Sequence, residues 1–129
     1  MTDAKTLNLR FYELFAVLLV GFSLHTAAFG VFPDVIQRGF HLGLALVLVY
    51  LTAMGDEKFT LKSAILISLA IVGALAATYQ ALFYDAVVNR YGAMTDPEIW
   101  IATIAVIILL DATRRTIGWS MVILALAFL

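Results

Sequence analysis

The chain divides into long apolar segments separated by short polar ones. Apolar residues dominate from Phe11 to Phe32, from Ile36 to Met54 and from Ser63 to Tyr84, and polar or turn-forming residues interrupt the chain between these segments. Each segment is close to the ~20 residues that a helix needs to cross the hydrocarbon core of a membrane. The pattern therefore predicts three membrane-spanning helices.

Two further apolar runs follow the polar connection YDAVVNRYGAMTD. A fourth span is expected from Pro97 to about Thr113, with Asp96 placed to cap the helix and Pro97 suited to its first turn. Its purely apolar part, Ile99 to Leu110, is short. The last run, Thr116 to Leu129, would extend only about 21 Å as a helix, against about 30 Å for the hydrocarbon core. We expect residues 116–129 to be the truncated start of a fifth helix.

Composition strengthens the membrane interpretation. The 129 residues are 64% hydrophobic and 13% charged, whereas about a quarter of the residues of a soluble domain are charged. The mean hydropathy is +1.02. These values predict an all-α integral membrane protein. A cleaved signal peptide is the alternative for the first segment, because Lys5 and Arg10 form a basic start, but its length and Glu13 favour a retained helix.

The basic residues predict the orientation of the helices. If the spans alternate, one side of the membrane holds six of the eight basic residues, and the other holds only Arg38 and Arg90. Lys and Arg favour cytoplasmic segments, so the N-terminus is expected in the cytoplasm. The six basic residues on that side are Lys5, Arg10, Lys58, Lys62, Arg114 and Arg115.

Small residues in the third segment predict where helices pack. Ala70, Gly73, Ala74 and Ala77 recur at the spacing that brings them to one face of a helix. Small side chains allow close approach of helices in lipid. This face is expected to contact a neighbouring helix.

Two histidines within the apolar segments suggest one candidate chemistry. His25 lies near the end of the first segment and His41 near the start of the second, so an antiparallel pair of helices would hold them at similar depth. Two such imidazoles can ligate a haem iron. Alternatively, each histidine forms hydrogen bonds across the helix bundle.

Glu13 provides a second candidate. A carboxylate on the first helix of a small four-helix protein can be the proton and cation site of a multidrug exporter. Glu13 is three residues from Arg10 and close to the expected membrane boundary, so an ion pair with Arg10 or a side chain that reaches the interface is the favoured explanation.

Asp111, Arg114 and Arg115 form a third group. On a helix, Asp111 faces Arg114 at i+3 and Arg115 at i+4, so the carboxylate can pair with a guanidinium group where the helix leaves the membrane. Basic residues after a span are also general in membrane proteins.

Other functions lack support in the sequence. The serines lack a nearby base, and the chain contains no glycine-rich phosphate loop, no zinc-site spacing and no cysteine. The net charge is −1, with no basic and aromatic stripe of the kind that binds nucleic acid. We therefore expect neither an enzyme nor a nucleic-acid-binding protein, and no cofactor or metal.

Three stretches carry a resemblance to a known family: RGFHLGLALVLVYL from Arg38, NRYGAMTDPEIW from Asn89 and LLDATRRTIGWSMVILALAFL from Leu109. They resemble the N-terminal part of the fused permease of TRAP transporters of the TAXI type. The last stretch is the most specific, because the family typically has Leu-Glu-Ala-Thr-Arg-Arg followed by a glycine. This chain has Asp in place of that Glu. The matching positions are Arg38, His41, Arg90, Gly92, Asp96, Asp111, Arg114, Arg115 and Gly118.

The resemblance implies a role in secondary active transport. Proteins of this family take up an organic, usually anionic, solute across the bacterial inner membrane, driven by a cation gradient, and a periplasmic binding protein delivers the solute. A small four-helix unit, here residues 1–115, braces a large permease domain that carries the substrate and ion sites. Residues 116–129 would then lead into that large domain, which lies outside this sequence.

Overall fold

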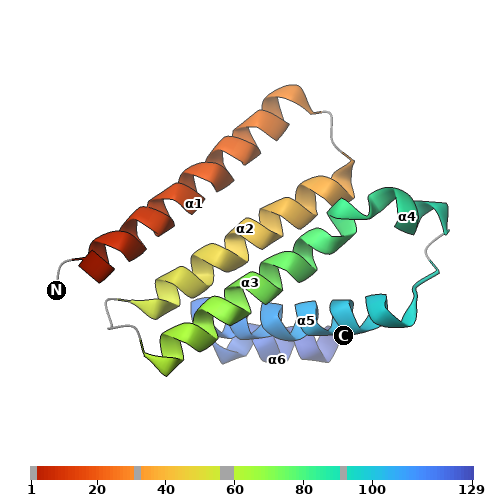
Figure 1. The fold of residues 1–129 in the computed structure, drawn as a ribbon. Helices are drawn as coiled ribbons and strands as arrows, with labels where there is room; N and C mark the ends of the chain where they lie inside the picture. Colours follow the sequence, from red (N-terminus) through yellow and green to blue (C-terminus); the bar gives the residue numbers. More distant parts are fainter. Residues whose placement is uncertain (1–2, 31–32, 56–59, 91–92) are drawn as a thin grey trace.

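The computed structural model of the chain describes residues 3–30, 33–55, 60–90 and 93–129, and within these ranges it consists of helices without strands (Figure 1). The all-α prediction is therefore confirmed for the described residues. The helices are α1 (Asp3–Phe29), α2 (Asp34–Met54), α3 (Leu61–Leu82), α4 (Tyr84–Asn89), α5 (Asp96–Thr116) and α6 (Trp119–Phe128).

Three of the described helices are long and apolar enough to cross a membrane. The qualifying segments are Thr6–Phe29 in α1, Asp34–Met54 in α2 and Leu61–Tyr79 in α3. The first helix begins at Asp3, well before the predicted Phe11, because the preceding polar residues include good helix formers and continue the helix beyond the apolar segment. It ends at Phe29, before Gly30, whose φ of 48° does not continue a helix.

The predicted fourth span lies within α5, but α5 is not among these three helices. It carries Asp96 and Glu98 in its first turn and Arg114 and Arg115 in its last turn. These charges and Asp111 confine its apolar part to Ile99–Leu110. The polar connection before α5 contains the short helix α4, and the last apolar run forms α6, a helix of ten residues.

The helices α1, α2 and α3 run antiparallel and side by side, with α2 in the middle (Figure 1). Helix α5 packs across α2 and α3, and α6 folds back along α5. The start of α1, the end of α2, the start of α3 and the α5–α6 turn lie at one end of the molecule (Figure 1). Arg10, Lys62, Arg114 and Arg115 belong to segments at that end, as the alternation of spans requires.

Small residues bring α2 and α3 into close contact. A Cβ atom added at Gly39 would lie 2.9 Å from the backbone oxygen of Ala77, and one at Gly43 would lie 3.0 Å from Cγ2 of Thr78. Ala70 and Gly73 are buried, and Ala77 packs against the core. The predicted packing face of α3 is therefore confirmed: Ala74 and Ala77 lie against a glycine pair on α2, and Gly73 lies against Ile108 of α5.

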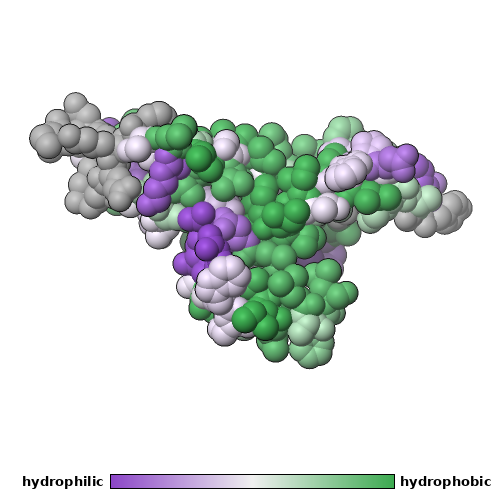
Figure 2. Space-filling model, turned by 90° about the horizontal axis from the view of Figure 1, so that it is seen from below, coloured by the Kyte–Doolittle hydropathy of each residue, from purple (hydrophilic) through white to green (hydrophobic). Residues whose placement is uncertain are grey.

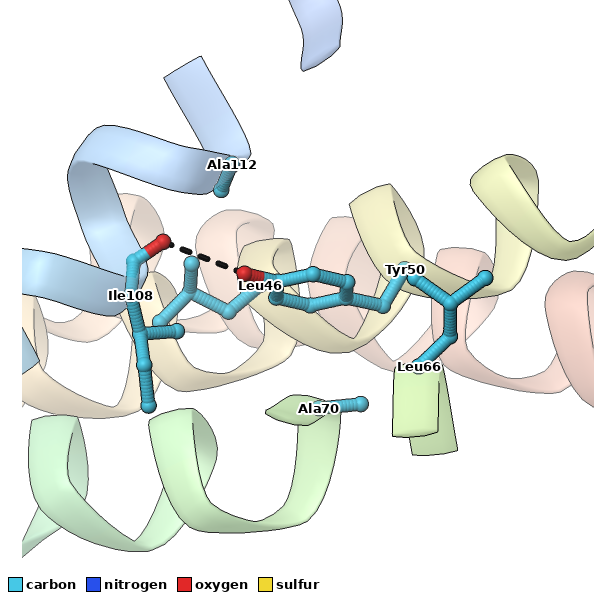
Figure 3. Close-up of a cluster of buried hydrophobic side chains, with 6 residues drawn as sticks. All are labelled: Leu46, Tyr50, Leu66, Ala70, Ile108 and Ala112. Atoms are coloured by element: carbon cyan, nitrogen blue, oxygen red, sulfur yellow. Dashed lines mark hydrogen bonds between the residues drawn. The ribbon is translucent and has the colours of Figure 1, made fainter. Parts of the chain in front are cut away.

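The buried core joins α2, α3 and α5 (Figure 3). Tyr50 is completely buried, and its hydroxyl lies 3.2 Å from the backbone oxygen of Ile108, to which it can donate a hydrogen bond. The core consists of Leu46, Tyr50, Leu66, Ala70, Ile108 and Ala112.

Much of the remaining surface is hydrophobic. In the view from below, hydrophobic residues cover much of the middle of the molecule, and hydrophilic residues form one group left of the centre and smaller groups toward the two ends (Figure 2). On α1, Val17 is 70% exposed and Leu24 is 65% exposed. An apolar band between polar ends is the surface that a lipid bilayer stabilises.

Candidate functional site

Asp111 is the centre of a group of polar contacts between α2 and α5. Its Oδ1 accepts a hydrogen bond from Nη2 of Arg114 at 2.9 Å, and its Oδ2 accepts one from Nε of Arg115 at 2.7 Å. The hydroxyl of Tyr50 lies 3.1 Å from the same Oδ2. The predicted pairing of Asp111 with one guanidinium group is thus exceeded, because Asp111 pairs with both, and Tyr50 adds a contact from a second helix.

Both guanidinium groups also lie over aromatic rings. The Cζ atom of Arg114 is 5.3 Å from the ring centroid of Trp119, and that of Arg115 is 5.8 Å from the ring centroid of Tyr50. These distances lie within the range of cation–π contacts. Together, the five residues connect the ends of α2, α5 and α6, and we call them the Asp111 cluster: Tyr50, Asp111, Arg114, Arg115 and Trp119.

The local sequence explains this arrangement. Residues three and four positions apart lie on one face of a helix, which brings both arginines to Asp111. The arginines lie in the last turn of α5, where positive charge is favourable. Gly118 lies directly before α6 and has a φ of 102°, a backbone conformation that residues other than glycine rarely adopt. The turn at Gly118 therefore returns Trp119 to Arg114.

The Asp111 cluster is suited to holding helices together. Its carboxylate is only 25% exposed and faces three donor groups, so its oxygens are already engaged. Two arginines against one carboxylate leave a formal charge of +1. A carboxylate in this state is a poor base or metal ligand, and its contacts link α2 to α5.

A second ion pair lies at the opposite end of α5. Nη2 of Arg90, just after α4, pairs with Oε1 of Glu98, and Oε2 of Glu98 accepts a hydrogen bond from the backbone N–H of Thr95 at 2.8 Å. Nε of Arg90 donates to the backbone oxygen of Ala86 at 2.9 Å. The Glu98 side chain is 9% exposed. We call Arg90, Thr95 and Glu98 the Glu98 cluster.

The predicted role of Asp96 as a helix cap is wrong. Thr95 is the N-cap residue of α5, and Asp96 is the first residue of the helix. Thr95 therefore takes the capping position expected of Asp96, and Glu98, three residues later, completes a capping box by accepting the backbone N–H of Thr95. The Asp96 side chain is exposed.

Polar side chains also connect α1 to α2. Oγ of Ser23 lies 3.3 Å from Nδ1 of His41, and Nε2 of Gln37 donates a hydrogen bond to Oγ1 of Thr26 at 3.2 Å. The interhelical hydrogen bond considered for His41 is therefore present. These four residues form the α1–α2 polar contact.

The structure does not bring His25 and His41 face to face. Ser23 is the α1 residue that contacts His41, and His25 lies two residues after it. Because each helical residue is rotated by about 100° from the last, the side chain of His25 leaves α1 about 200° around the helix from that of Ser23. The ring of His25 packs instead against Phe29, with 5.1 Å between ring centroids. This arrangement offers no pair of axial ligands for a haem between α1 and α2.

The remaining candidates lie at the surface or outside the described residues. Arg38 forms an exposed ion pair with Asp34 at 2.7 Å. Glu13 is exposed on α1, and among the described ion pairs none joins it to Arg10. Gly92 lies outside the described residues.

Three features were missed in the sequence. Thr95 and Glu98 have the T-x-x-E spacing of a capping box, and Gly39 and Gly43 have the G-x-x-x-G spacing of close helix contacts, so both had a local signal. Tyr50 had none, because its importance depends on α5 reaching it from more than fifty residues away.

One cavity in the described part of the chain borders the Glu98 cluster. This cavity of about 250 Å³ has mainly apolar walls that come largely from α3 and α5, with Glu98 at its edge, but Arg90 and Thr95 already engage that carboxylate. The described residues contain no group of three or more His, Asp or Glu side chains placed to hold a metal ion.

The fold and these clusters define an all-helical protein with three helices able to cross a membrane and polar clusters at the two ends of α5. Comparison with known protein families, with curated proteins and with solved structures gave no match.

Proposed function

We propose that this chain is the scaffold part of a TRAP-type transporter, which takes up an organic anion across the bacterial inner membrane using a cation gradient. In this proposal the chain is not an enzyme. It braces a large permease domain, which carries the substrate and ion sites, and a periplasmic binding protein delivers the solute.

The Asp111 cluster is the observation that supports this proposal most. The LLDATRRTIGW stretch is the most specific part of the resemblance, and its Asp111, Arg114 and Arg115 contact one another and α2. Gly118 and Trp119 of the same stretch form the turn into α6. Residues that hold helices in place, with their carboxylate already paired, suit a scaffold better than a transport site.

We further propose that α5 is a fourth span and that the N-terminus is cytoplasmic. The charged side chains near each end of α5 that would oppose insertion are largely paired: Glu98 with Arg90, and Asp111 with Arg114 and Arg115. Pairing lowers the cost of placing charges near a membrane. The end that holds Arg114 and Arg115 would then face the cytoplasm, as the distribution of basic residues favours.

A transport assay tests the proposal. Proteoliposomes should take up solute only when the chain is combined with a TRAP-type large permease domain, its binding protein and an imposed sodium gradient, and the chain alone should transport nothing. Proton-driven efflux by the chain alone, lost in Glu13→Gln, would instead identify a multidrug exporter. Purified protein with a haem absorption band would support a redox anchor.

A binding assay tests the outer surface. Asp96 is exposed beside the Glu98 cluster, at the end we assign to the periplasm, so Asp96→Ala should weaken binding of the periplasmic protein. Asp34→Ala removes another exposed carboxylate at that end and is the matched control. Equal affinities for the two variants, measured by surface plasmon resonance on reconstituted protein, would exclude Asp96 from the docking surface.

A further inference from the structure

A pocket of about 400 Å³ lies between the end of α2 and the end of α5. It lies next to the Asp111 cluster, where the apolar residues of α5 give way to charged ones. Its walls combine apolar side chains, two hydroxyls and one guanidinium group. They are formed by Val49, Thr52, Ala53, Arg115 and Thr116.

Arg115 is the charged group of this pocket and retains unused donors. Its Nε donates to Asp111, and among the described residues no acceptor is bonded to its two Nη groups. The bond to Asp111 and the ring of Tyr50 hold the guanidinium group in place. Because the Asp111 cluster has a formal charge of +1, an anion at the Nη edge would balance it.

The two hydroxyls do not add donors to the site. The hydroxyl of Thr52 donates to the backbone oxygen of Leu48 at 2.8 Å, and that of Thr116 donates to the backbone oxygen of Ala112 at 3.0 Å. The pocket therefore selects its ligand by one guanidinium group beside an apolar wall. A ligand that fits has one anionic group joined to an apolar body.

We propose that this pocket binds the phosphate of an anionic phospholipid. Guanidinium groups bind phosphate oxygens through paired hydrogen bonds. The pocket lies at the end of a membrane-length helix, where lipid headgroups meet the protein, and basic pockets between helices are suited to anionic headgroups. The lipid chains would extend from the pocket along the apolar surfaces of the helices. This inference does not depend on transport.

Native mass spectrometry of the full chain in detergent tests the proposal. With equal amounts of phosphatidylglycerol and phosphatidylcholine, the protein should retain phosphatidylglycerol preferentially. Arg115→Gln should lower that preference about tenfold, as expected for loss of a charged hydrogen bond. Arg114→Gln is the matched control. It also removes one positive charge and one partner of Asp111, but Arg114 does not line the pocket.

A second variant keeps the test valid if Arg115→Gln does not fold. Thr52→Phe fills the pocket from the exposed side of α2 without changing charge, and it should also abolish the preference. Equal retention of the two lipids, equal effects of the two arginine variants, or a normal preference in Thr52→Phe would overturn the proposal. Displacement of the lipid by inorganic phosphate at equal concentration would also overturn it, because the site would then bind any phosphate.

Discussion

On one side α2 packs against α3 through glycines and alanines, and on its other side it meets α1 through polar side chains and one aromatic pair. At Gly39 the backbone oxygen of Ala77 lies only 2.9 Å from the position that a Cβ atom would take. Between α1 and α2, by contrast, the described contacts include Ser23 with His41 and Gln37 with Thr26, and the rings of Phe22 and Phe40 are 6.0 Å apart.

The difference shows which part of the molecule is a rigid unit. Helices α2, α3 and α5 share the buried core, and the Asp111 cluster also joins α2 to α5. In the apolar part of α1 that is long enough to cross a membrane, only 6% of the residues are buried. Most of the surface of α1 is therefore left for lipid or another protein. A few polar bonds in lipid contribute less than close packing over a whole helix face. We therefore expect mutations in the unit formed by α2, α3 and α5 to lower the free energy of unfolding far more than mutations between α1 and α2.

Reversing the charge of both arginines should have the largest effect. In Arg114→Glu with Arg115→Glu, three carboxylates would stand where one carboxylate now pairs with two guanidinium groups. Repulsion of this kind costs several kcal/mol, and the end of α5 also loses its positive charge. Cysteine-accessibility mapping should show an altered topology or loss of assembly. A normal accessibility pattern would show that these arginines do not fix the orientation.

Gly39→Val should cause the second-largest loss of stability. Its new Cβ would lie 2.9 Å from the backbone oxygen of Ala77, which cannot move without shifting α3, and overpacking of this kind costs about 3 kcal/mol. The free energy of unfolding can be measured by titration with sodium dodecyl sulfate. Gly21→Val on α1 is the control, because nothing lies within 4 Å of its added Cβ. Equal losses for the two variants would contradict the comparison.

Asp111→Ala should destabilise the protein by about 2 kcal/mol, because two guanidinium groups and the buried Tyr50 hydroxyl lose an acceptor. Asp34→Ala also removes a carboxylate paired with an arginine, but that pair is exposed and should contribute less than about 1 kcal/mol. The same unfolding titration compares them. A smaller loss for Asp111→Ala than for Asp34→Ala would mean that the Asp111 cluster does not hold α2 to α5.

Gln37→Ala should have the smallest effect. It removes the hydrogen bond to Thr26, and such bonds between membrane helices contribute about 0.6 kcal/mol. The unfolding free energy should therefore change by less than for Gly39→Val or Asp111→Ala. A loss as large as that of Gly39→Val would show that α1 belongs to the rigid unit.

Local patterns predicted much of the fold. The apolar segments located α1, α2, α3 and the body of α5, because burial in lipid requires long uninterrupted runs of apolar residues. The predicted ends of the helices were less accurate. Residues Asp3–Arg10 extend α1 beyond its predicted start, although they are more polar than the rest of the helix. The residues 84–89 form α4, although the sequence there resembled a simple polar connection.

The clusters were predicted only where their residues are near in sequence. Asp111, Arg114 and Arg115 lie within one turn of a helix, so spacing alone predicted their pairing. The contact of Tyr50 with Asp111 depends on how α5 crosses α2, which no local pattern contains. His25 and His41 were expected at similar depth, and depth alone did not reveal that they leave their helices toward different sides.

The close approach at Gly39 and Gly43 has a mechanical consequence. If α3 moved along α2 by one turn, about 5.4 Å, Ala74, which now lies against Gly43, would meet the side chain of Leu46 instead. The two helices therefore cannot slide past each other by a turn without a clash. A push on the α4 end of this pair would be carried to the end that bears the Asp111 cluster as the displacement of one stiff rod.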